Sequence, residues 1–101
     1  MYNQEIKTKA TAAKVAKSLE KDLNDAIGFF DGYKVDVECD SDRYEVYVTS
    51  KTYCKILTDS VLGYLFKLAM IYSTQYAAFT YHISTREENR PAFVFSVIWN
   101  K

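Results

Sequence analysis

Hydrophobic residues in the first quarter of the chain recur at intervals of three and four, which is the period of an α-helix. The apolar positions that share one face are Ala12, Ala16, Leu19, Leu23, Ala26 and Ile27. This spacing predicts an amphipathic helix over residues 4–27. We expect Asn3 to cap its N-terminus, Glu5 to lie in its first turn and Gly28 to end it.

The period then changes to two, which is typical of half-buried strands. Apolar and polar residues alternate over residues 33–39 and again over 44–49, and turn-forming residues occupy positions 40–42 between them. The two runs therefore predict a β-hairpin. Residues 52–57 fit either a third short strand or a direct approach to the next helix, and the sequence leaves both open.

Helical spacing returns over residues 61–76, after three good N-cap candidates at 58–60. Alternation follows over 77–84, then a charged loop over 85–91. The last strand, 92–99, is apolar on both faces, as central or doubly covered strands are. The expected order is therefore helix, two or three strands, helix and two strands.

Every link between strands except the helical crossover can be a hairpin, so this order predicts an α+β fold. We expect a two-layer sandwich in which an antiparallel sheet of four or five strands carries both helices on one face. No linker or internal repeat divides residues 1–101, which indicates a single domain. In topology only, the order resembles the secretion-chaperone-like sandwiches, which are small, dimeric and non-catalytic. That resemblance implies a binding module and transfers no residues.

The second predicted helix is apolar around most of its circumference, and Lys67 is the only formally charged residue between Ser60 and Tyr81. A helix of this kind is buried on more than one side, whereas a two-layer domain covers only one. We therefore expect a second copy of the chain to cover its outer side, through Tyr64, Phe66, Met70 and Ile71. Internal cover by the first helix and the loops is the alternative. A membrane span is disfavoured because polar residues interrupt the apolar run.

Composition narrows the classes of function. The 13 Lys and Arg residues balance the 13 Asp and Glu residues, whereas a dedicated duplex-DNA binder gathers excess positive charge. A chain with zero net charge also does little to keep its copies apart. The first residues show no signal peptide, and two cysteines, Cys39 and Cys54, are typical of reduced thiols. These features predict a cytoplasmic protein.

Two charged surfaces are predicted on the outside of the domain. The first helix carries a basic row opposite its apolar stripe: Lys7, Lys14, Lys17 and Lys21. The hairpin carries an acidic row: Asp36, Glu38, Asp40 and Asp42. The basic row can bind phosphates or an acidic partner, or it can be a plain solvated helix face. The acidic row can be a docking surface, or it can be a solvated strand whose charges prevent aggregation. A calcium loop is disfavoured because residues 36–42 contain no glycine, so we expect no metal and no cofactor.

Catalytic chemistry has little support in the sequence. His82 is the only histidine, and we expect it to lie on the opposite face of the sheet from Cys39. An exposed platform for stacking bases would use Tyr47 with either Tyr81 or the aromatic residues of the last strand: Phe93, Phe95 and Trp99. The leading hypothesis is a non-enzymatic protein-binding, inhibitor or accessory module that works as a homodimer and contacts a larger protein. Single-stranded nucleic-acid binding comes second, and a small enzyme that relies on His82 comes third.

Overall fold

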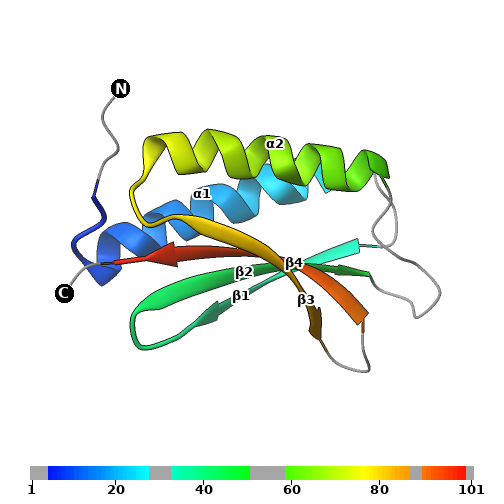
Figure 1. Cartoon of the computed structure of the whole chain (residues 1–101). Coiled ribbons are helices and arrows are strands. Elements are labelled where there is room, and N and C mark those ends of the chain that lie inside the picture. Colours follow the sequence, from blue (N-terminus) through cyan, green and yellow to red (C-terminus); the bar gives the residue numbers. More distant parts are fainter. Residues whose placement is uncertain (1–4, 28–32, 51–58, 87–89, 100–101) are drawn as a thin grey trace.

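The computed structural model describes residues 5–27, 33–50, 59–86 and 90–99. Its elements are α1 (Lys9–Ile27), β1 (Tyr33–Cys39), β2 (Arg43–Ser50), α2 (Asp59–Gln75), β3 (Thr80–Arg86) and β4 (Arg90–Ile98). The predicted α+β class and the order α-β-β-α-β-β are confirmed (Figure 1). The optional strand over residues 52–57 and the helix stop at Gly28 lie outside the described residues.

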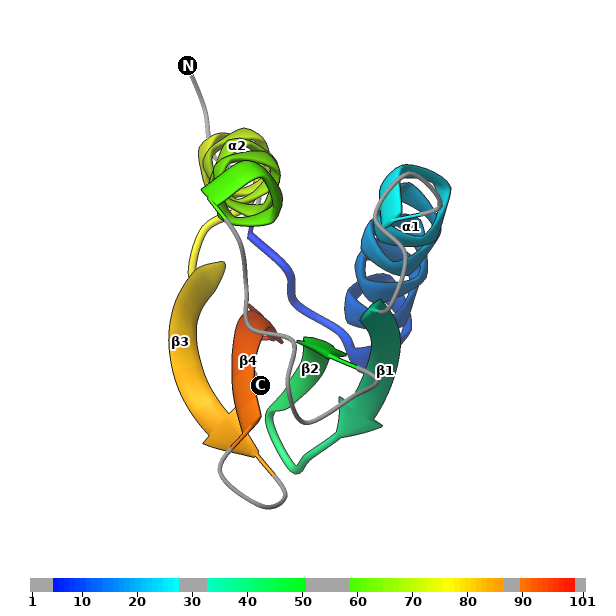
Figure 2. The same cartoon turned by 90° about the vertical axis from the view of Figure 1, so that its right-hand side faces the viewer.

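All strand pairs are antiparallel, and the sheet has the order β1-β2-β4-β3. The hairpin links β1 to β2, and β4 lies between β2 and β3. Both helices lie on the same side of this sheet, with α1 on the side of β1 and α2 on the side of β3 (Figure 2). The predicted two-layer sandwich is therefore correct. We call the side of the sheet that carries the helices the helix-side face, and the opposite side the outer face.

The core forms where the helical stripes meet the helix-side face of β2 and β4. Phe93 and Phe95 of β4 lie opposite Val48 and Val46 of β2, and all four are fully buried. The helices cover them with buried apolar side chains, of which all but Val15 and Ala69 belong to the predicted stripes: Ala12, Val15, Ala16, Leu19 and Leu23 from α1, and Val61, Leu65, Leu68, Ala69 and Tyr72 from α2. Burial of each large side chain stabilises the fold by about 1.5–3 kcal/mol.

Strand β4 is buried on its outer face as well, which confirms that its two apolar faces mark a central strand. Val94 lies in register between Tyr47 of β2 and His82 of β3, whose longer side chains flank it. Two hydroxyl oxygens on this face, Thr49 Oγ1 and Ser96 Oγ, are buried without a hydrogen-bond partner among the described residues. A buried hydroxyl in this condition costs about 1–3 kcal/mol.

A buried tyrosine joins the two helices. The Tyr72 hydroxyl of α2 donates a hydrogen bond to Asp22 Oδ2 of α1 at 2.8 Å, and it lies 3.2 Å from Ser18 Oγ. Burial of the phenol and its contact with the Asp22 carboxylate raise the pKa of Tyr72 to about 12. The helices therefore share a polar contact within an otherwise apolar layer.

Helix α1 begins at Lys9 rather than at residue 4, so the predicted start and the cap at Asn3 are wrong. Thr8 caps the helix instead: its Oγ1 accepts a hydrogen bond from the Thr11 amide at 3.2 Å, and its carbonyl accepts one from the Ala12 amide. The preceding segment is not helical, although Ile6 is buried in the core. Glu5 therefore lies outside the first turn that was predicted for it.

The other boundaries move by a few residues. Helix α2 begins at Asp59, two residues before the predicted start, and ends at Gln75. A turn at 77–78 then replaces the predicted beginning of the strand, and Ala78 adopts a left-handed φ of 63° because the chain must reverse where no glycine is present. Strands β3 and β4 continue into the predicted charged loop, since main-chain pairing extends to Arg86 and Arg90.

Candidate interaction surfaces

The outer residues of α2 divide between two flanks of the helix. Phe66 and Met70 are four positions apart, and the ring of Phe66 contacts Tyr81 of β3, whereas Met70 points further outward. Tyr64 lies on the other flank, towards α1, where burial and the nearby carboxylates of Asp22 and Asp25 raise its pKa. The predicted partner interface is therefore not one surface: the structure brings Phe66 and Met70 together and places Tyr64 apart from them.

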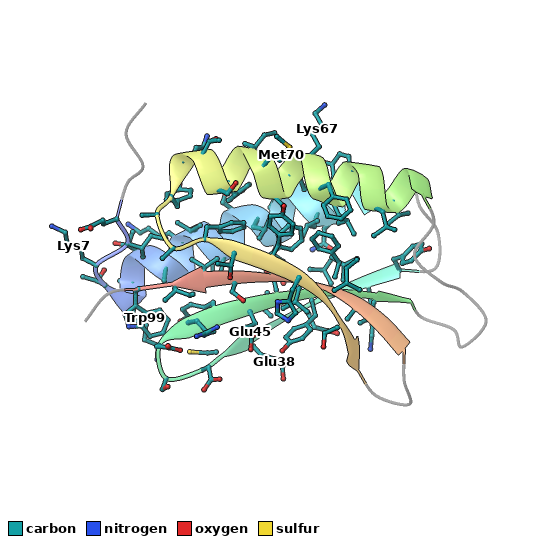
Figure 3. All side chains as sticks on the ribbon, viewed as in Figure 1. Lys7, Glu38, Glu45, Lys67, Met70 and Trp99 are labelled. Carbon is teal, nitrogen blue, oxygen red and sulfur yellow. The ribbon has the colours of Figure 1, made fainter. Side chains whose placement is uncertain are left out.

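Ile71 belongs with Tyr64, because seven residues complete about two helical turns. It is 42% exposed, about the same as Phe66 at 40%, but it lies about 140° from Phe66 around the helix axis. Met70 and Lys67 lie on the side of α2 turned away from the sheet (Figure 3). Ile71 and Phe66 thus offer two positions of similar exposure on different flanks of one helix.

Strand β3 extends the surface that begins with Phe66 and Met70. Tyr81 and Ile83 lie on the helix-side face, opposite Phe95 and Phe93 of β4. Because β3 is an edge strand, both side chains remain partly exposed. The Phe66 ring meets the Tyr81 ring edge-on at 5.9 Å between centroids, so the two elements present one continuous apolar surface.

We call this surface the α2–β3 patch. It consists of Phe66, Met70, Tyr81 and Ile83, which are 40%, 64%, 40% and 53% exposed. The buried ring of Phe93 supports it from below, with centroids 5.2 Å from Phe66 and 5.9 Å from Tyr81. Strand periodicity showed that Tyr81 and Ile83 share a face, but only the order of the strands places them at an uncovered edge.

The predicted basic row is only partly helical. The α1 lysines, Lys14, Lys17 and Lys21, are all exposed on the helix. Lys7 is exposed too, but it precedes α1 because the helix begins at Lys9 (Figure 3). One member of the predicted basic row therefore lies outside the helix.

The predicted acidic surface has two parts with different geometry. At the turn, Asp40 Oδ1 accepts a hydrogen bond from the Ser41 amide at 2.8 Å, and Asp42 forms an ion pair with Arg43 at 3.0 Å. These carboxylates shape the hairpin. On β1, Asp36 lies 3.8 Å from Lys34 Nζ, in an ion pair on the outer face.

Glu38 lies directly opposite Glu45 across the hairpin, and Figure 3 shows both below the sheet, away from the helices. Glu45 also accepts a hydrogen bond from the Tyr47 hydroxyl at 3.2 Å. Like charges that face each other across two strands destabilise the pair. The two carboxylates therefore give the outer face of the hairpin an acidic character.

The residues considered for catalysis lie far apart. Cys39 is in β1 on the helix-side face, whereas His82 is in β3 on the outer face, so they occupy opposite faces and opposite edges of the sheet. Cys39 is a free, exposed thiol, and Cys54 lies outside the described residues. Over the described ranges, no three His, Cys, Asp or Glu side chains gather as metal ligands.

The aromatic residues considered for base stacking are divided by the sheet. Phe93, Phe95 and Trp99 are buried in the core. Tyr47 lies on the outer face and Tyr81 on the helix-side face, so these two rings form no common platform. Neither described helix has the length and apolar composition needed to cross a bilayer.

No family model, curated protein or solved structure matches this chain. The function is therefore inferred from the geometry described above.

Proposed function

We propose that this chain is a non-enzymatic protein-binding module that works as a homodimer and uses the α2–β3 patch for self-association. The observation that carries the proposal is the patch itself: four large apolar side chains from two elements, each at least 40% exposed, with Phe66 and Tyr81 in ring contact. Contiguous exposed apolar surface on a small domain marks an interaction site.

A second copy of the chain is the occupant that best fits this patch. A two-fold interface uses the same surface on both subunits, and an apolar patch is complementary to itself, whereas a charged one is not. Zero formal net charge leaves no long-range repulsion to oppose the encounter. The charged surfaces on α1 and on the hairpin lie elsewhere and stay available in the dimer.

The side chains of the patch allow the binding free energy of the dimer to be calculated approximately. Completing the burial of a half-exposed large apolar side chain contributes about 1 kcal/mol. Four such side chains on each of two copies contribute about 8 kcal/mol, which equals the binding free energy of a micromolar complex before the cost of association is subtracted. The patch alone therefore supports a weak dimer, and a stable dimer requires further contacts.

The outer face of the hairpin is the surface we assign to a larger protein partner. The facing carboxylates of Glu38 and Glu45 favour a partner segment that carries Lys or Arg. The exposed free thiol of Cys39 fits a reducing compartment, so we place the protein in the cytoplasm. In affinity capture from cells that make the protein, a partner should be retained by wild-type bait and lost by Glu38→Lys/Glu45→Lys bait. Retention by both baits would contradict this assignment.

Sedimentation or light scattering of matched variants tests the homodimer. Met70→Glu places a charge in the patch and should produce a folded monomer, because a buried unpaired carboxylate costs several kcal/mol. Ile71→Glu makes the same change at the neighbouring position on the other flank of α2 and should remain a dimer. Equal dissociation of both variants, or of neither, would exclude the α2–β3 patch as the interface.

A further inference from the structure

The two edges of the sheet are protected to different degrees. Strand β1 forms one edge and carries three charged residues on its outer face, Lys34, Asp36 and Glu38. Strand β3 forms the other edge and has no acidic residue, lysine or arginine before Arg86. Charged side chains on edge strands are a common protection against pairing with another sheet. In the described part of the chain, nothing pairs with the free edge of β3, and its sequence lacks this protection.

The sequence of β3 is nearly symmetric about His82. Reading outward from this residue, Tyr81 and Ile83 are both large and apolar, and Thr80 and Ser84 both carry a hydroxyl. In an antiparallel pair of two β3 strands centred on His82, each residue from Thr80 to Ser84 therefore faces one of its own kind. Cross-strand pairs of aromatic with β-branched residues, and of Thr with Ser, are stabilising.

Other centres do not produce this match. If the two-fold axis passed through Tyr81, Thr80 would face the imidazole of the partner's His82. If it passed through Ile83, Ser84 would face it instead. Only the pairing centred on His82 places apolar residues opposite apolar residues and hydroxyls opposite hydroxyls.

The same pairing brings the α2–β3 patches together. Helix α2 lies on the helix-side face beside the edge strand, so a two-fold axis perpendicular to the sheet places both copies of α2 on one side (Figure 2). In that pair the flank of α2 that carries Phe66 faces its copy, and Tyr81 lies across from the partner's Ile83. The main-chain hydrogen bonds between the strands supply the contacts that the side chains of the patch lack.

We infer that two copies of this chain join by antiparallel pairing of their β3 edges, centred on His82, so that the two four-stranded sheets form one continuous sheet of eight strands. This inference rests on the proposed homodimer and specifies its strand register. The outer faces of both hairpins lie at the far ends of the joined sheet and remain accessible.

Cysteine cross-linking measures this register. In a Cys39→Ser/Cys54→Ser background, His82→Cys should form a covalent dimer on mild oxidation. Directly opposite residues in an antiparallel pair lie about 4.5–5.5 Å apart between Cα atoms, within the range that a disulfide spans. Thr80→Cys in the same background should not cross-link, because its copy is displaced by four residues, about 13 Å along the strand. Mixing the Thr80→Cys and Ser84→Cys proteins should restore the cross-link as a heterodimer.

The outcomes separate the register from the homodimer. Cross-linking at position 82 and in the 80–84 mixture, but not at 80 alone, supports the inference. Equal yields at positions 80, 82 and 84 alone would indicate collisions and overturn it. Absence of a cross-link at 82 in a protein that still sediments as a dimer would overturn the register and leave the homodimer. A monomeric parent protein would overturn both.

Discussion

The hydrogen bond between the two helices provides a quantitative test of how the helical layer is held together. The Tyr72 side chain is 5% exposed, and its hydroxyl donates to Asp22 at 2.8 Å. Tyr72→Phe keeps the ring and removes this bond. A hydrogen bond to a charged acceptor contributes about 1.5–3 kcal/mol. Asp22 is only half-buried and can form hydrogen bonds with water once the tyrosine hydroxyl is gone. We therefore expect Tyr72→Phe to lower the free energy of unfolding by about 1–2 kcal/mol.

The pH dependence gives the same hydrogen bond a second signature. Burial and the Asp22 carboxylate raise the pKa of Tyr72 to about 12 in the folded protein, whereas a tyrosine in the unfolded chain titrates near 10. The folded state therefore holds the phenolic proton more tightly. The resulting stabilisation is fully present below pH 10 and is lost as the pH rises towards 12, by about 2–3 kcal/mol in all.

Urea denaturation at fixed protein concentration, at pH 8, 10 and 11, measures both effects. At pH 8 the free energy of unfolding of the wild type should exceed that of Tyr72→Phe by the full difference of about 1–2 kcal/mol. At pH 11 this difference should be smaller. Asp22→Asn is the matched control, because its amide oxygen still accepts the hydrogen bond while the charge is gone. Its free energy of unfolding should fall by less than that of Tyr72→Phe. Equal stability of Tyr72→Phe and wild type at pH 8, or a difference that stays constant up to pH 11, would refute this account of Tyr72.

Three further predictions concern other parts of the domain. Thr49→Val removes a buried hydroxyl without a partner among the described residues and should raise the free energy of unfolding by about 1 kcal/mol. A lower free energy of unfolding in urea denaturation would show instead that the hydroxyl has a hydrogen-bond partner. Ala78→Gly relieves a left-handed φ of 63° and should stabilise the fold by about 0.5–1 kcal/mol, and a lower melting temperature would contradict this. A labelled single-stranded oligonucleotide should show no measurable binding at physiological salt; tight, salt-sensitive binding that is lost when the α1 lysines are changed to Glu would instead support the nucleic-acid alternative.

The fold was predictable from the sequence because the apolar residues of its core recur at the period of a helix or of a strand. The apolar stripes of both helices and the alternation of β1 and β2 show directly which residues turn inward. The two apolar faces of β4 predicted a central strand, and β4 does lie between β2 and β3. The start of α1 was missed because Asn3 and Glu5 suit a helix N-terminus, whereas Thr8 caps the helix and Ile6 is buried without being helical.

The candidate site was harder to predict because it depends on how the elements are arranged. Helical spacing alone separates Phe66 from Ile71 around α2, but it does not show which flank lies beside another element. The alternation over residues 77–84 places Tyr81 and Ile83 on one face of the strand, and this is the helix-side face. Their exposure follows from the position of β3 at the edge of the sheet, and strand order is a property of the whole fold.

The oligomeric state of the unmodified protein tests the central claim most directly. Sedimentation equilibrium at micromolar concentration and physiological salt should give a species of twice the chain mass of 11.7 kDa, in reversible exchange with the monomer. A single species of 11.7 kDa at every concentration up to the solubility limit would contradict the homodimer and, with it, the role assigned to the α2–β3 patch.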